Sequence, residues 1–85
     1  MTIELESIKS KISDVLNSKI SREAASNWAT KIRKAGDDRA LEYVPTSDEE
    51  KIWKGIIYIE GIDTKDSPDS YLHNNHDIED FLHTL

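Results

Sequence analysis

The side chains closest to a metal-binding pattern are His73 and His76, which form an H-x-x-H spacing. A zinc site needs a third or fourth ligand in fixed geometry, and Asp69 and Asp77 are near enough in the sequence to join this pair. Histidine and asparagine residues beside a helix start are more often capping and loop residues than metal ligands. We therefore expect no metal site and no cofactor.

Carboxylates recur at every third residue of the segment 63–69. A calcium-binding loop needs oxygen ligands at its first, third and fifth positions and glycine at its sixth. In this segment the third, fifth and sixth positions are Lys65, Ser67 and Pro68. An Asx-type turn before Pro68 explains the segment without a bound ion.

The residues needed for covalent catalysis are missing. The chain has no cysteine, which excludes a cysteine nucleophile, a disulfide framework and a zinc knuckle. It has no G-x-S-x-G motif, and its three glycines are too scattered to form a phosphate-binding loop. The pair Glu49 and Glu50 lies at a predicted helix start, where the helix dipole favours carboxylates. A chain of 85 residues also leaves little room for a substrate pocket beside a core, so we expect that the protein is not an enzyme.

Four segments carry apolar residues at the i, i+3, i+4, i+7 spacing of an amphipathic helix. The sequence therefore predicts an all-α fold, a small bundle of about four helices in a single domain 1–85, with helices at 2–18, 22–35, 47–60 and 76–84. The short linker between the first two segments predicts an antiparallel helical hairpin. Trp28 and Trp53 lie on apolar stripes and are expected in the core.

Polar residues and glycines mark the expected helix boundaries. Gly36 is expected to end the second helix in a left-handed conformation, and the segment 47–50 is a capping box that starts the third. Gly55 within the third helix is expected to allow close approach of another helix. Two alternatives stay open: a short helix at 37–43 and a strand at 56–59. Residues 63–75 are expected to form a long polar loop.

Charge is distributed unevenly along the chain. The net charge is −6, with a balance of +3 over residues 1–36 and −9 over residues 37–85. An acidic surface repels nucleic acid phosphates and attracts basic partners. We therefore expect no direct nucleic-acid binding. No apolar run is long enough to span a membrane and no secretory signal is present, so we also expect a cytoplasmic protein with no membrane partner.

The small size, acidic charge and helix count resemble those of bacterial immunity proteins that neutralise colicin-like or contact-dependent toxins. The segment Asp66-Ser67-Pro68-Asp69-Ser70-Tyr71 is similar to part of the D-S-P-x-x-x-x-Y-Y pattern of that family. The resemblance implies binding of a basic protein partner, such as a toxin nuclease domain, by acidic side chains with Tyr or Trp anchors. The alternative is a small bacterial protein-interaction or adaptor domain of unassigned function.

The acidic C-terminal half is the expected partner-binding surface, because a long loop and a short terminal helix bring its carboxylates close in sequence. The residues predicted to form it are Asp63, Asp66, Asp69, Tyr71, Asp77, Glu79 and Asp80.

Overall fold

A computed structural model describes all 85 residues, and it is mostly helical. The four helices are α1 (Leu5–Leu16), α2 (Arg22–Asp37), α3 (Glu49–Glu60) and α4 (Asn75–His83). Four short strands, β1 (Thr2–Glu4), β2 (Glu42–Val44), β3 (Lys65–Ser67) and β4 (Ser70–Tyr71), and a 3-10 turn, η1 (Thr46–Asp48), lie between or before them. The predicted count of four helices is confirmed, whereas the strictly all-α description is wrong because the strands form two small sheets.

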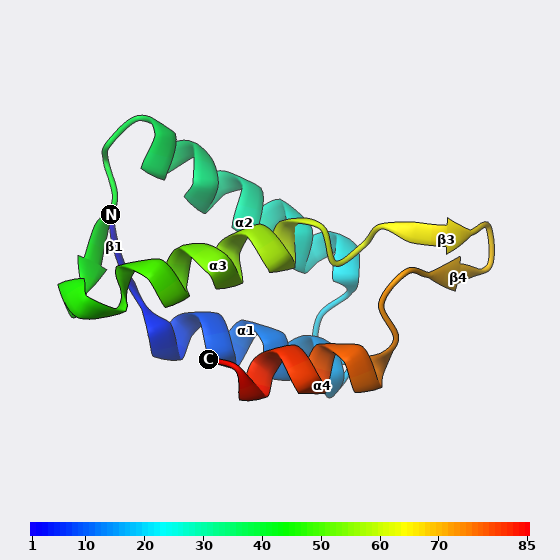
Figure 1. Cartoon of the computed structure of the whole chain (residues 1–85). Coiled ribbons are helices and arrows are strands. Elements are labelled where there is room, and N and C mark those ends of the chain that lie inside the picture. Colours follow the sequence, from blue (N-terminus) through cyan, green and yellow to red (C-terminus); the bar gives the residue numbers. More distant parts are fainter.

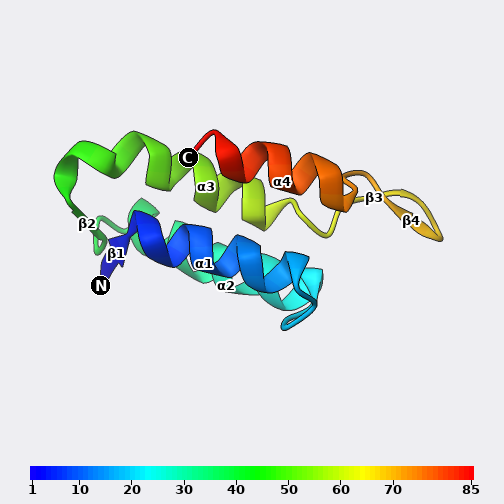
Figure 2. The same ribbon diagram turned by 90° about the horizontal axis from the view of Figure 1, so that it is seen from below.

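The helices lie in two layers (Figures 1 and 2). Helices α1 and α2 form the expected antiparallel hairpin in one layer, and α3 and α4 form the other. Helix α3 packs over the seam between α1 and α2, while α4 packs beside it against α1. Helix α2 therefore forms one edge of the molecule and α4 the opposite edge.

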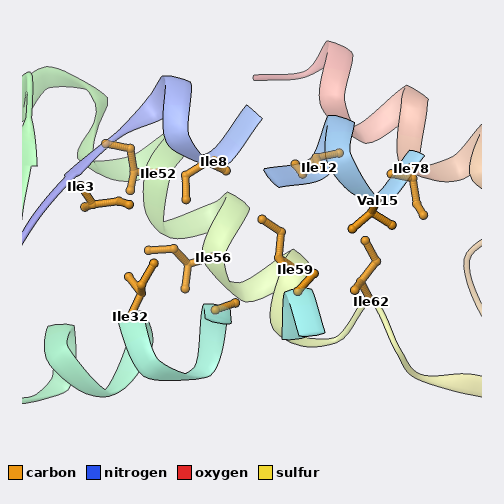
Figure 3. Packing of buried hydrophobic residues seen from close by; sticks show 12 residues of the cluster. Ile3, Ile8, Ile12, Val15, Ile32, Ile52, Ile56, Ile59, Ile62 and Ile78 are labelled. Carbon is orange, nitrogen blue, oxygen red and sulfur yellow. The ribbon is translucent and has the colours of Figure 1, made fainter. Parts of the chain in front are cut away.

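The core is built from isoleucine and small residues that meet at the centre of these layers (Figure 3). Each helix contributes through the predicted spacing, and the cluster comprises Ile3, Ile8, Ile12, Val15, Ala25, Ala29, Ile32, Ile52, Ile56, Ile59, Ile62 and Ile78. Trp28 and Trp53 are partly buried and pack against the outside of this cluster. Gly55 does allow close packing, because a Cβ there would overlap the Cγ2 atom of Ile8.

The first predicted helix begins later than expected, because residues 2–4 form a strand. Strand β1 pairs in parallel with β2, and Ile3 lies opposite Tyr43. Ile3 is 5% exposed, so the pairing places an apolar side chain in the core. The alternative of a short helix at 37–43 is therefore wrong, because α2 ends at Asp37 and residues 42–44 form strand β2.

Two predicted helix boundaries, Gly36 at the end of α2 and the capping box at the start of α3, are wrong. Gly36 lies inside α2 with a negative φ, and Arg39 takes the left-handed conformation with φ 57°. A Cβ on Gly36 would lie 2.8 Å from Cζ3 of Trp53, so this glycine makes room for the indole. Ser47 lies in η1, and Asp48 precedes α3 without a side-chain cap, so the predicted capping box does not form.

The remaining alternatives are settled by α3 and by the segment after it. Residues 56–59 belong to α3 and not to a strand. The segment 63–75 contains the antiparallel hairpin β3–β4, which projects beyond the ends of the helices (Figures 1 and 2). No helix is long and apolar enough to cross a membrane.

Candidate functional site

A groove of about 480 Å³ runs between α1 and α2, and none of its lining residues comes from α3 or α4. Ser7, Ser10 and Lys11 line it from α1, and Trp28 and Lys31 line it from α2. Two hydroxyl groups and two ammonium groups therefore face one groove from two helices. Hydroxyl and ammonium donors in this arrangement suit an anionic ligand such as a phosphate group.

The outer surface of α2 continues this groove with a row of polar side chains. Asn27, Lys31 and Lys34 are exposed and follow each other at spacings of four and three residues. At 3.6 residues per turn they fall within about 60° of arc on the helix. We define the α1–α2 face as the hydrogen-bond donors and the aromatic residue that α1 and α2 contribute to the groove and this row: Ser7, Ser10, Lys11, Asn27, Trp28, Lys31 and Lys34.

The cations of the α1–α2 face are not neutralised by ion pairs. None of its three lysines takes part in a salt bridge, and the ammonium of Lys11 lies 4.9 Å from the ring centroid of Trp28. Asp14 also lines the groove, so the local balance of Lys11, Lys31 and Asp14 is positive. The α1–α2 face is therefore a cationic patch on a chain whose net charge is −6.

Helix α2 is held in place by polar contacts to the end of α3. The hydroxyl of Ser26 donates to the backbone oxygen of Glu60, and Nε of Arg33 lies 2.8 Å from both carboxylate oxygens of Glu60. Arg33 also donates to Asp37 at 2.8 Å. These contacts lower the pKa of Glu60, chiefly through the hydrogen bond from Arg33, and raise the pKa of Arg33. The orientation of the α1–α2 face is fixed by this anchoring.

The structure places the predicted partner-binding residues on two separate elements. Asp66 and Asp69 are exposed on the β3–β4 hairpin, and Asp63 lies partly buried before it. Tyr71 is not a free anchor, because its hydroxyl donates to Glu23 at 2.6 Å. The guanidinium of Arg22 lies 4.3 Å from the ring centroid of Tyr71.

The contact between Tyr71 and Glu23 changes the acidity of both groups. The hydrogen bond from Tyr71 lowers the pKa of the Glu23 carboxyl, and the same bond raises the pKa of the Tyr71 phenol. Tyr71 thus fastens the hairpin to the start of α2.

The predicted carboxylates of α4 also have local partners. Asp77 closes a capping box with Asn74: its backbone N–H donates to the side chain of Asn74 at 2.8 Å, and its carboxylate accepts from the Asn74 N–H at 3.1 Å. Asp80 lies 3.3 Å from Nδ1 of His76, and Glu79 is exposed. Two of the three predicted carboxylates on α4, Asp77 and Asp80, therefore have partners within the chain.

The H-x-x-H pair is divided between a loop and a helix. His73 accepts a hydrogen bond from Arg22 through its backbone oxygen, and its ring lies 5.1 Å from that of Tyr58. His76 lies in the first turn of α4. No group of three or more His, Asp or Glu side chains is arranged to hold a metal ion.

Comparison with known proteins identifies a family. A family model described as "YxzC DNA-binding protein" matches residues 2–85. A relative from Bacillus subtilis (strain 168), "Uncharacterized protein YxzC", is 36% identical over 72 residues, which cover 85% of this chain and 53% of the relative. The chain therefore spans about half the length of that relative. No solved structure matches.

These matches correct the prediction made from charge. The resemblance to toxin immunity proteins is wrong, because the chain matches a different family over nearly its whole length. The neutralisation of a toxin by an acidic surface and the absence of direct nucleic-acid binding are likewise contradicted by the description of that family. The +3 balance of residues 1–36 was the sequence signal for the α1–α2 face, and the larger negative balance of the rest concealed it.

Proposed function

The chain belongs to the YxzC DNA-binding protein family, and we propose that it binds DNA through the α1–α2 face. The family match over residues 2–85 is the observation that carries this proposal. The proposed role is binding without catalysis, in the cytoplasm.

The charge of the α1–α2 face supports this role. Non-specific DNA binding comes from lysine and arginine side chains that replace counterions on the phosphates. The lysines of the face form no salt bridge, whereas Arg22 and Arg33 are occupied by contacts within the protein. A local cationic patch attracts DNA even when the net charge of the chain is negative, because contacts at the interface are less than a Debye length apart.

The test is a fluorescence anisotropy titration of a labelled 30-base-pair duplex of mixed sequence at 50 to 200 mM salt. Non-specific dissociation constants of DNA-binding proteins are about 10⁻⁴ to 10⁻⁶ M at physiological salt, so binding is expected in that range. The double variant Lys31→Ala/Lys34→Ala is expected to reduce the slope of log affinity against log salt by about 2.

The matched control is Lys51→Ala/Lys54→Ala, which removes two exposed lysines from α3 in the other layer. Both double variants change the net charge equally, so a general charge effect would weaken both to the same degree. Equal loss in the two variants contradicts the assignment of the α1–α2 face. No binding by the wild-type chain at about 100 μM and 50 mM salt contradicts DNA binding itself.

A further inference from the structure

Of the two helices of the α1–α2 face, α2 lies at the edge of the molecule (Figure 1). It has 16 residues, which correspond to about 24 Å of helix, and it forms an edge of the bundle (Figure 1). Its buried residues Ala25, Ala29 and Ile32 face α1 and α3, and the row Asn27, Lys31 and Lys34 is exposed. The major groove of B-DNA is about 12 Å wide and admits one α-helix. An edge helix with a polar, cationic outer row has the shape and charge for that groove.

The aromatic side chains argue against a single strand as the ligand. Proteins that bind single-stranded DNA stack the bases on exposed aromatic rings. All six Trp, Tyr and Phe side chains are partly buried, and none is fully exposed. Trp28, the aromatic residue of the α1–α2 face, packs against the core on one side and lies under the Lys11 ammonium. The face therefore offers hydrogen-bond donors and positive charge, and its one aromatic ring is partly buried and already covered by a lysine.

We infer that the DNA bound by this chain is double-stranded and that α2 lies in its major groove; this inference rests on the DNA-binding function proposed above. Asn27, the first residue of the exposed row on α2, faces the base edges, and an asparagine carboxamide pairs with the N6 and N7 atoms of adenine. Lys31 leans toward α1 and lines the groove with Lys11 and Ser10. These three side chains contact the phosphates of the strand that borders the major groove.

The anchoring of α2 fits this mode of binding. Base contacts need a helix that keeps its orientation, because a displaced donor loses its hydrogen bond. Ser26 and Arg33 fasten α2 to the last residue of α3 without using any side chain of the exposed row. The carboxylate of Asp38 follows the row at the end of α2, and Glu23 at its start is held by Tyr71. The row therefore lies between carboxylates at the two ends of α2, and only the part from Asn27 to Lys34 enters the groove.

The experiment compares ligands that occupy different grooves of the same duplex. Labelled duplex bound to the full chain is titrated with methyl green, which binds the major groove, and separately with netropsin, which binds the minor groove. Methyl green is expected to displace the chain and netropsin to leave it bound. The single strand of the same sequence is expected to bind at least about tenfold more weakly than the duplex, since it lacks the groove and carries a lower charge density.

A variant with a matched control tests the position of α2. Asn27→Glu places a carboxylate in the exposed row, one turn before Lys31, and is expected to weaken duplex binding at least about tenfold. Asn17→Glu makes the same change at an exposed residue in the α1–α2 turn and is expected to change affinity less than about twofold. Circular dichroism spectra of both variants serve as the control for folding.

The outcomes separate this inference from the function on which it rests. Displacement by netropsin alone, equal binding of single strands, or equal effects of the two Glu variants would overturn the placement of α2 while DNA binding stands. Failure of the wild-type chain to bind any of these DNAs would overturn both.

Discussion

At the scale of single residues, Gly55 sets the distance between α1 and α3. A side chain at this position has no space, because its Cβ would overlap Ile8, which is fully buried. Gly61, at the end of α3, differs: the nearest atom to a Cβ there is Oγ1 of Thr64 at 3.8 Å, and its φ is −95°. The two glycines therefore serve as a test and its control.

Gly55→Ala is expected to lower the free energy of unfolding by about 1–2 kcal/mol, since overpacking outweighs the better helix propensity of alanine. Gly61→Ala is expected to change it by less than about 0.5 kcal/mol. Urea denaturation followed by circular dichroism measures both. Equal stability of the two variants would show that α1 can move away from α3 at little cost.

At the scale of elements, the ion pair between Arg33 and Glu60 joins α2 to α3. Because the pKa of Glu60 is lowered in the folded chain, its contribution to stability is present above the unfolded value near 4.5 and is lost as pH falls through the folded value. The pair is partly exposed, so solvent screening keeps its contribution to stability small.

Glu60→Gln is therefore expected to be less stable than the wild type at pH 7, and this difference is expected to shrink as pH falls below about 4.5. Thermal melts between pH 7 and pH 3 measure the effect, with the exposed Glu79→Gln as the control variant. A difference between Glu60→Gln and wild type that is constant over this range would indicate that the charge of Glu60 contributes nothing.

The elements also show how far sequence patterns extend. The four helices follow from apolar stripes such as Ile8, Ile12 and Val15, because that spacing is a local property of the chain. The pairing of β1 with β2 is not local, since it joins residues 40 positions apart, such as Ile3 and Tyr43, and strands of three residues carry little pattern. The local pattern predicts that Gly36 ends a helix. In the structure Gly36 instead lies against Trp53, a contact that no local pattern reveals.

The candidate site was missed for a related reason. Lys11 and Lys31 are 20 residues apart in sequence and line one groove only after the α1–α2 hairpin forms. Composition sums such charges with distant carboxylates, and the sum hid a cationic face behind a net charge of −6. Field strength at an interface depends on local charges, so net charge alone does not decide a partner.

At the scale of the whole molecule, the acidic hairpin and the α1–α2 face lie on different parts of a body of 37 × 24 × 20 Å. Asp66 and Asp69 act on DNA at the face only through long-range repulsion, which salt screens. Asp66→Asn/Asp69→Asn is therefore expected to raise DNA affinity up to about threefold at 10 mM salt, where the Debye length is about 30 Å, and to have no effect at 150 mM.

Anisotropy titrations at the two salt concentrations measure this effect. A lower affinity of the double variant at either concentration would mean that the hairpin takes part in binding DNA.

The projecting hairpin also makes the molecule easy to label. Its tip is exposed, and loop tips with small polar residues tolerate chemical change. The chain has no cysteine, so Ser67→Cys would create a unique thiol for a maleimide dye in β3, on the hairpin that projects beyond the helices (Figure 1). Energy transfer from that dye to an acceptor on one end of a duplex would then report which way round the protein sits on DNA.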